Sequence, residues 1–221
     1  MSIRIAWDIS HQEFTIQDDY YYSKLRTEIY KHKGVVDELK KLEDVKKYDV
    51  LVINYPEKGF RNDEVVLITR FLEKGGKVIA LGYYRNEDGV ADAINSLSEK
   101  IGLILMNDAV IDESSNHDSE KYFVITRRIY RYNTNAQIVL MPCSASIKLI
   151  TNDSFKIVIG EDTSKTTSGN IPIMAAGRKI GKGEFILVGT CVFWDNHSIE
   201  KYDNLKFSLN LLLKASKVRS F

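Results

Sequence analysis

The chain has 221 residues, of which 44% are hydrophobic, and this length suits one large α/β domain better than two. Its 31 Lys and Arg residues nearly balance 30 Asp and Glu residues, so the overall charge gives no electrostatic footprint of nucleic-acid binding. The sequence shows neither a transmembrane apolar run nor a signal-peptide pattern, and we expect a cytoplasmic protein. A composition rich in Lys, Glu and Tyr is typical of thermophile proteins.

The beginning of the chain predicts a strand, a helix and a second strand. Residues 3–7 alternate between apolar and polar side chains, which indicates a strand that leads into a polar loop. A helix follows, with Asp18 and Asp19 at its N-terminus and Gly34 at its end. Val35 then opens a second strand.

The clearest pattern lies between residues 49 and 82. Residues 49–54 form a nearly continuous apolar run, which is typical of a strand buried on both faces of a parallel sheet. Asn62 is the predicted N-cap of a helix that ends at Gly75. Residues 77–82 form another apolar run. Together these segments predict a right-handed βαβ unit.

The rest of the chain predicts further helices and strands of the α/β domain, interrupted by a stretch of short antiparallel strands. A helix is predicted to end at Gly102, and a short strand follows it. Residues 184–189 predict a further strand, and the closing helix starts at Asp203 and buries Leu205, Leu209, Leu212 and Leu213. Between them, about residues 107–170 predict antiparallel strands at 122–125, 137–141, 146–150 and 155–159. We therefore predict one flavodoxin-like domain over residues 1–221, a three-layer α/β/α fold with a mostly parallel sheet and an antiparallel β insertion.

The order and spacing of several segments resemble a known superfamily. Residues 49–82, the stretch 181–196 and the closing helix are similar to class I glutamine-amidotransferase-like proteins. The nearest branches are the trehalose-utilisation-type proteins and the uncharacterised domains related to intraflagellar-transport and gliding-motility domains. The Asp-x-x-His-x-Glu start of those uncharacterised domains resembles residues 8–13 here.

The chain departs from this superfamily at the catalytic position. Amidotransferases carry a nucleophilic Cys in a Gly-x-Cys-x-Gly turn, and the matching stretch here begins at Gly82. Tyr84 stands in place of the Cys, and Asn86 stands in place of the second Gly. A phenol with a pKa of about 10 is a poor substitute for a thiolate. The resemblance thus implies a non-catalytic ligand-binding or scaffold domain rather than a glutamine amidotransferase.

Four loops are predicted to meet at the carboxyl edge of the sheet, where ligands of open α/β sheets bind. They span residues 8–13, 54–60, 83–86 and 190–197. We expect this edge to bind a protein partner or a small polar ligand, without a cofactor, and homo-oligomer formation is an open alternative. The candidate ligand-binding residues are Asp8, His11, Tyr55, Tyr83, Tyr84 and Trp194.

An alternative hypothesis places a hydrolase-like site at the same edge. His11, Glu13, Asp195 and His197 could act there as an acid/base group or as metal ligands. Their spacing matches no local metal-binding motif.

Two further features are expected to be structural. The cysteines Cys143 and Cys191 are expected to be inert buried thiols. A basic stretch with Arg127, Arg128 and Arg131 is expected to form a solvated strand face, so nucleic acid is not the expected partner.

Overall fold

The computed structural model describes residues 2–167 and 169–214, and its centre is a twisted sheet. Within the described residues this sheet has seven strands. In spatial order they are β10 (Ser154–Ile159), β11 (Ile173–Ile180), β12 (Gly183–Val188), β4 (Lys77–Leu81), β3 (Val50–Asn54), β1 (Arg4–Asp8) and β2 (Val35–Leu39).

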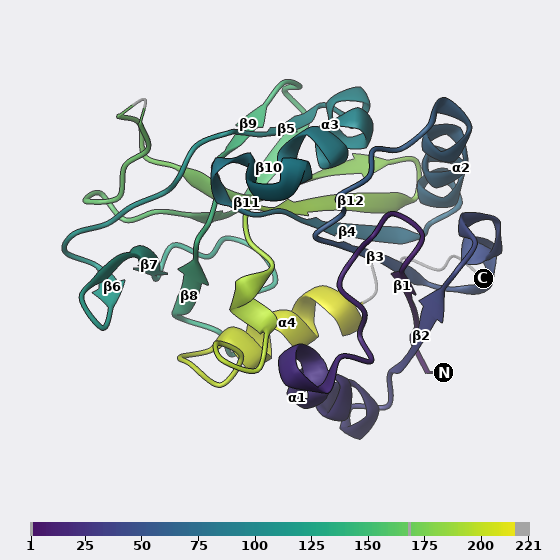
Figure 1. Cartoon of the computed structure of the whole chain (residues 1–221), viewed down its shortest axis with the longest axis horizontal. Coiled ribbons are helices and arrows are strands. Elements are labelled where there is room, and N and C mark those ends of the chain that lie inside the picture. The colour runs from purple at the N-terminus through teal and green to yellow at the C-terminus, as the bar shows by residue number, and fades with distance from the viewer. Residues whose placement is uncertain (1, 168, 215–221) are drawn as a thin grey trace.

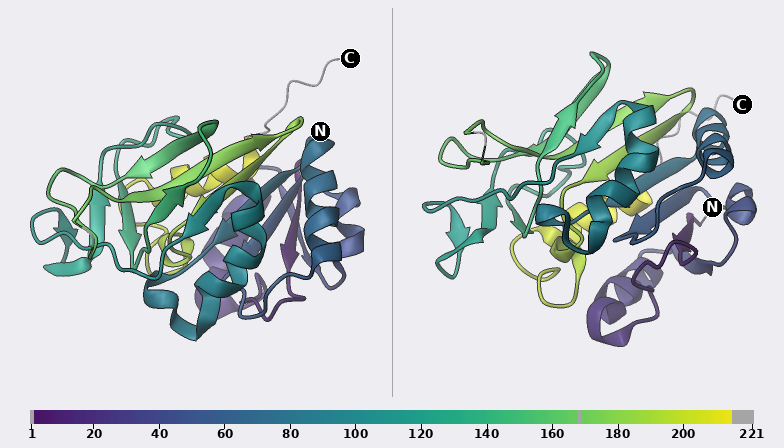
Figure 2. Two further views of the ribbon diagram at one scale, coloured as in Figure 1. Left: turned by 90° about the horizontal axis from the view of Figure 1, so that it is seen from above. Right: turned by 45° about the horizontal axis from the view of Figure 1, so that its top comes forward.

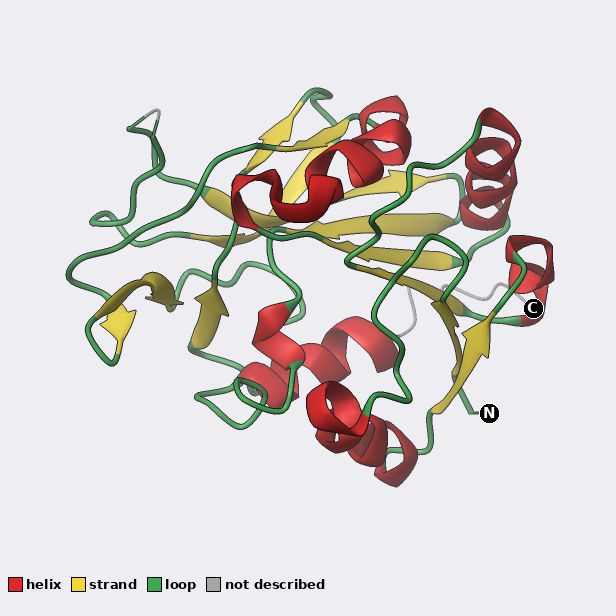
Figure 3. Cartoon of the chain, in the orientation of Figure 1, coloured by secondary structure: helices red, strands yellow, loops and turns green. Residues whose placement is uncertain are grey.

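Helices cover both faces of the sheet (Figures 1 and 3). One face carries α2 (Asn62–Glu73) and α3 (Val90–Ile101), and the other carries α1 (Asp19–Lys31) and α4 (Asn204–Leu213). Short 3-10 segments lie at Leu42–Lys47, Tyr84–Gly89 and Val192–Trp194. No helix of the described residues is long and apolar enough to cross a membrane. The flavodoxin-like three-layer architecture predicted from the sequence is confirmed.

Most strands of the sheet run parallel, so their carboxyl ends share one edge. Parallel pairs join β1 to β2 and β3, β3 to β4, and β4 to β12. Every residue of β3 and β4 is buried, as their apolar runs predict. The antiparallel strands β10 and β11 complete the sheet beyond β12.

The βαβ unit β3–α2–β4 forms as predicted, with one change at the start of the helix. The N-cap position is Arg61, and Asn62 is already helical. The Arg61 backbone N–H donates to Glu64 Oε2 at 2.8 Å, so an acidic residue of the first turn satisfies this group. The Asn62 side chain is turned outward and accepts a hydrogen bond from Lys100 Nζ at 2.6 Å.

The segment at residues 107–170 forms a small sheet of its own and also supplies a strand to the central sheet. It supplies the three-stranded sheet β6 (Asn116–His117), β7 (Glu120–Thr126) and β8 (Val139–Pro142), at the opposite end of the molecule from β1 and β2 (Figures 1 and 2). Its strand β9 (Ile147–Leu149) pairs with β5 (Leu103–Leu105). Its last strand, β10, enters the seven-stranded sheet. The insertion therefore completes the central sheet.

Helix α4 buries Leu212 as predicted, but the rest of its buried face differs from the predicted one. Its buried residues are Asn204, Phe207, Ser208, Leu211 and Leu212, whereas Leu205, Leu209 and Leu213 are only partly buried. Asn204 explains the rotation, because its amide donates to the carbonyl of Leu140 and accepts from the same residue's N–H. A polar side chain inside the core therefore sets the orientation of this leucine-rich helix.

Candidate binding site at the carboxyl edge of the sheet

The four predicted edge loops contact one another. The ring of Phe14, after β1, lies 5.2 Å from that of Tyr55, after β3, and Tyr55 lies 5.5 Å from Tyr83, after β4. The indole N–H of Trp194, after β12, donates to Asn54 Oδ1 at 3.2 Å. Parallel strands bring these loops together because their carboxyl ends end at the same edge.

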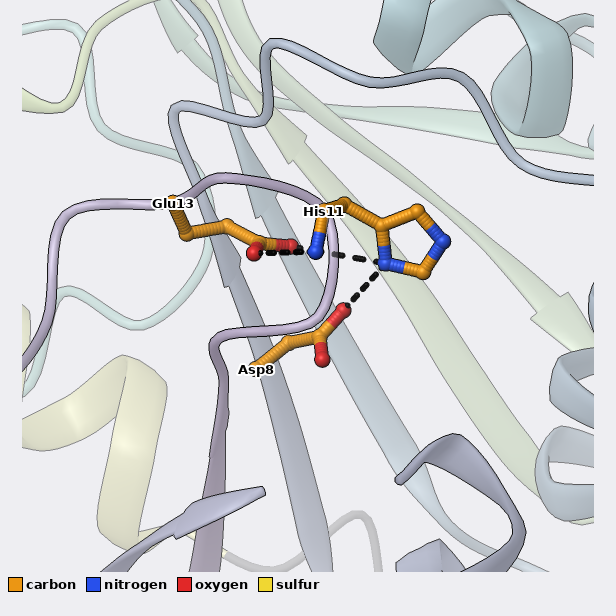
Figure 4. A group of neighbouring side chains, drawn as sticks. All are labelled: Asp8, His11 and Glu13. Carbon is orange, nitrogen blue, oxygen red and sulfur yellow. Dashed lines mark hydrogen bonds and ion pairs between the residues drawn. The ribbon is translucent and has the colours of Figure 1, made fainter. Parts of the chain in front are cut away.

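The first loop holds a compact group formed by Asp8, His11 and Glu13 (Figure 4). One potential ligand atom from each residue lies within 4.8 Å of the others. His11 Nδ1 is 2.8 Å from Asp8 Oδ2 and 3.7 Å from Glu13 Oε1. All three side chains are buried. Oε1 of Glu13 has no hydrogen-bond partner among the described residues.

His11 also ties its loop to the neighbouring loop. Its Nε2 lies 3.3 Å from Glu64 Oε2, and its ring stacks on Phe60 with 4.0 Å between centroids. Its carbonyl accepts from the N–H groups of Glu57 and Lys58, both at 3.1 Å. The imidazole is thus enclosed by protein groups and faces Glu64 rather than solvent.

Burial and mutual charge shift the pKa values of this group in different directions. Burial and then the Asp8 charge raise the pKa of Glu13 to about 9. Burial works to raise the pKa of Asp8, but hydrogen bonds from His11, Glu13 and Ser10 hold that pKa below its usual value. Burial works to lower the pKa of His11, which Asp8 and Glu64 nevertheless raise above its usual value. Glu13 is therefore neutral at neutral pH, while the pKa shifts of Asp8 and His11 both favour their charged forms.

The other two candidate catalytic residues lie outside this group. Asp195 Oδ1 accepts from the backbone N–H groups of His197 and Ser198, both at 2.9 Å. The His197 ring lies against Tyr20 and Tyr21. The four residues of the hydrolase hypothesis therefore form two pairs with different contacts, since His11 and Glu13 gather around Asp8 whereas Asp195 and His197 contact each other and α1.

An aromatic cavity of about 200 Å³ opens beside the buried group. Rings from three of the loops and from α1 form most of its wall, and two carboxyl groups complete it. The lining residues are Phe14, Tyr21, Tyr22, Tyr55, Tyr83, Glu87, Cys191, Val192 and Asp195.

Trp194 is linked to the wall of this cavity through Asn54. It is fully buried, between Trp7 at 5.4 Å and Phe193 at 5.2 Å between ring centroids. The Asn54 amide that accepts from its indole N–H also donates to the Tyr22 hydroxyl at 2.8 Å. Trp194 is thus part of the core, and Asp8 and His11 are buried as well, so no side chain of the three lies open at the surface of the edge. Their predicted contact with a ligand stays a prediction.

The wall carries two carboxyl groups in different surroundings. Glu87 is exposed, whereas Asp195 is buried, and burial raises the pKa of its carboxyl although hydrogen bonds from the backbone of His197 and Ser198 oppose this. The Tyr55 hydroxyl donates to Asp88 Oδ2 at 2.8 Å, which fixes its ring as part of the wall. Among the described residues, no Lys, Arg or His lines the cavity.

Tyr84 lies at the start of an unusual turn beside the cavity. Arg85 and Asn86 follow it with φ of 58° and 54°, so both adopt the left-handed conformation that few residues other than Gly, Asn and Asp take up readily. The Tyr84 N–H donates to the carbonyl of Cys143, whose φ is 50°. Cys191 is buried as expected, whereas Cys143 is only partly buried, and burial raises the pKa of both thiols. Both thiols are therefore protonated at neutral pH, as expected for inert cysteines.

The basic stretch follows β7 as a loop rather than forming the predicted strand face, and two of its arginines contact other parts of the protein. Arg128 pairs with Asp162 at 2.7 Å, and Arg131 lies over the Phe155 ring at 4.1 Å from its centroid. These contacts leave fewer charges for phosphate groups than the sequence suggests.

Comparison with known proteins places the chain in a family. The sequence model of the IFT52 GIFT domain family matches residues 5–124 of this chain, so the chain belongs to that family. An uncharacterized protein of Aquifex aeolicus (strain VF5) is 48% identical over 96% of this chain and 94% of that protein.

Two solved structures share the architecture. The mmIFT52 N-terminal domain has a TM-score of 0.77 at 18% identity, covering 92% of this chain and 93% of that one. A putative ThuA-like protein from Bacteroides uniformis has a TM-score of 0.52 at 9% identity, covering 96% and 89%. Such low identities show the fold alone. The wider amidotransferase-like assignment stays a prediction.

Proposed function

Because the chain belongs to the IFT52 GIFT domain family, we propose that it is a non-catalytic scaffold domain that binds a partner protein at the carboxyl edge of its sheet. The partner inserts one lysine or arginine side chain into the aromatic cavity. The observation that carries this proposal is the composition of the wall, in which five aromatic rings combine with Glu87 and Asp195.

The size of the cavity supports a single side chain as its occupant. Pockets for drug-sized ligands and cofactors typically have volumes of about 300–1,000 Å³. A volume of about 200 Å³ is smaller than these. It suits one long side chain that is delivered by a larger molecule.

The chemistry of the wall supports a positive charge on that side chain. A cation over an aromatic ring gains about 0.5–2 kcal/mol, depending on how far it is removed from water. The buried carboxyl of Asp195 gives a second source of attraction at the inner wall, and Glu87 gives a third at the rim.

Exposed rings next to the cavity supply further contact area. Phe14 is 39% exposed, and Tyr20 is 66% exposed and packs edge-on against Tyr21 of the wall. Aromatic residues are enriched at protein interfaces and dominate their binding energy. A partner chain that fills the cavity would therefore cover these rings as well.

Model compounds test the proposal by NMR. We expect N-acetyl-lysine amide and N-acetyl-arginine amide to shift the backbone signals around Tyr55, Tyr83 and Asp195. N-acetyl-norleucine amide, which has a similar shape without the charge, should shift them less at equal concentration. Equal shifts with all three compounds, or shifts confined to another surface, would contradict the proposal.

A pair of tyrosine variants locates the effect. Tyr83→Leu keeps an apolar side chain but removes the ring, and it should reduce the response to the lysine compound severalfold. Tyr130→Leu is the matched control, because Tyr130 is 55% exposed and does not line the cavity. Equal responses of the two variants would place binding elsewhere.

A further inference from the structure

We propose that Asp8, His11 and Glu13 bind a divalent transition-metal ion such as Zn²⁺, which fixes the loop after β1. The ligand atoms are Asp8 Oδ2, His11 Nδ1 and Glu13 Oε1. This site is separate from the aromatic cavity, and its existence does not depend on the partner proposed above.

The distances fit a shared ion. Two ligand atoms bonded to zinc at about 2.0–2.1 Å in a tetrahedral arrangement lie roughly 3.3 Å apart. The two distances from His11 Nδ1, 2.8 Å to Asp8 Oδ2 and 3.7 Å to Glu13 Oε1, lie on either side of this value. Shifts of about half an ångström would therefore bring both carboxylate oxygens to this distance from His11 Nδ1, and all three ligand atoms already lie within 4.8 Å of one another.

The independent observation is the unpartnered oxygen of Glu13. Its Oε1 is buried without a hydrogen bond, and its side chain has no exposed surface and points toward His11 (Figure 4). A buried polar atom without a partner costs about 1–3 kcal/mol, so such atoms are rare and call for a missing group. A metal ion between the three side chains would be that group.

The surrounding contacts already hold the remaining atoms of each ligand. Asp8 Oδ1 accepts from the Ser10 hydroxyl at 2.7 Å, and Glu13 Oε2 accepts from the His11 backbone N–H at 2.7 Å. His11 Nε2 lies against Glu64, whose other oxygen pairs with Arg61 at 2.7 Å. A carboxylate on the second ring nitrogen is the usual support of a metal-binding histidine.

The charges and ligand types select the kind of ion. In the bound state the two carboxylates balance a dication, and the imidazole is neutral. One nitrogen and two oxygens suit Zn²⁺, Mn²⁺, Fe²⁺ or Co²⁺, whereas Ca²⁺ and Mg²⁺ favour sites made of oxygen alone. Since the three side chains are buried, the ion enters when the loop opens or while the chain folds.

Cobalt uptake is the test, because Co²⁺ is coloured when bound to such ligands. The full chain is stripped with a chelator and refolded from denaturant with excess Co²⁺, and bound metal is measured by absorption and elemental analysis. We expect one equivalent of Co²⁺, displaced by Zn²⁺, and a raised Tm in the presence of either ion. A refolded protein that holds no metal would overturn the proposal.

Variants identify the ligands. Glu13→Gln keeps the shape and removes the charge, so the variant should fold, which circular dichroism verifies, but lose the bound equivalent. Glu64→Gln acts on the orientation of His11 and should weaken binding by about 10–100-fold. His117→Ala is the control, because His117 lies beside Asp118 at the surface, 3.3 Å from its carboxylate. Uptake that survives Glu13→Gln or disappears with His117→Ala would assign the metal to another site.

Discussion

At the scale of single residues, the side chains that decide the structure are polar groups inside the core. Lys77 is buried, and its Nζ donates to the carbonyls of Leu211, at 2.8 Å, and Lys214 at the end of α4. An ammonium group at a helix C-terminus satisfies carbonyls that the helix itself leaves free. Burial nevertheless lowers the pKa of Lys77 to about 8, although the Glu184 charge opposes this.

This pKa predicts a pH dependence of stability that disappears in Lys77→Met. Below pH 8 the lysine is charged in both states, and its full burial cost is present. Between pH 8 and 10.5 the folded state loses this proton before the unfolded state does, so the free energy of unfolding rises with pH. The rise is roughly 3 kcal/mol at most, at about 1.4 kcal/mol per pH unit.

Urea denaturation at pH 7.5 and pH 10 measures this effect. The difference in unfolding free energy between wild type and Lys77→Met should increase at the higher pH. Lys74→Met is the control, because Lys74 is exposed and should show no such change. If the difference in unfolding free energy between wild type and Lys77→Met is the same at both pH values, Lys77 keeps its proton in the folded protein.

The candidate site shows why such residues escape sequence reasoning. The Asp-x-x-His-x-Glu pattern identifies residues 8–13 as candidates, but this local pattern does not predict that Phe60 and Glu64 enclose the His11 imidazole. Those contacts depend on how two loops pack. The sequence likewise offers Trp194 as a candidate ligand-binding residue, because it lies in a loop after a strand, whereas the structure buries it against Trp7.

At the scale of elements, buried periodic segments were predictable to within one or two residues. The predicted strand at residues 49–54 is β3 at Val50–Asn54, and the helix that stops at Gly102 is α3. Continuous apolar runs and glycine ends are local signals, which the fold preserves. The face of α4 was not predictable, because Asn204 binds a strand 64 residues away in the chain.

The start of α1 gives a direct test of a local signal. Asp18 Oδ1 accepts from the backbone N–H groups of Tyr20, at 2.9 Å, and Tyr21, at 3.3 Å. Asp18→Ala should lower the free energy of unfolding by about 1 kcal/mol through loss of this N-cap. In Asp19→Ala the loss should be smaller, since Asp19 makes only an exposed ion pair with Arg26. Chemical denaturation compares the two, and equal losses would argue against the cap.

At the scale of the whole molecule, the β-rich insertion and the central sheet are packed backbone to backbone. The Ala145 N–H donates to the Gly189 carbonyl at 2.9 Å, just beyond the end of β12. A Cβ on Gly189 would lie 2.1 Å from the Ala145 carbonyl oxygen. The sequence predicts the insertion but not this contact, because strand patterns carry no information on which backbones approach closely.

Gly189→Ala tests how tightly the two parts are joined. The added methyl group must push the backbones apart, so we expect a loss of at least about 1–3 kcal/mol in the free energy of unfolding. Gly59→Ala is the matched control, since its Cβ would meet the Ser96 side chain at 3.3 Å from Oγ and 3.6 Å from Cβ, with no backbone atom nearby in the described residues. Thermal unfolding distinguishes them, and similar Tm values for both variants would mean that the insertion packs loosely.

The cavity depends on all of these features, because single aromatic rings and residues of four loops form its wall and the parallel strands bring those loops together. The most direct measurement is a crystal structure of the protein grown with N-acetyl-lysine amide. The account predicts the ammonium group among the rings of Tyr55 and Tyr83, within reach of the Asp195 carboxylate. A well-ordered cavity that is empty in crystals grown at a saturating concentration of the compound would contradict this account. So would a compound that is bound only elsewhere.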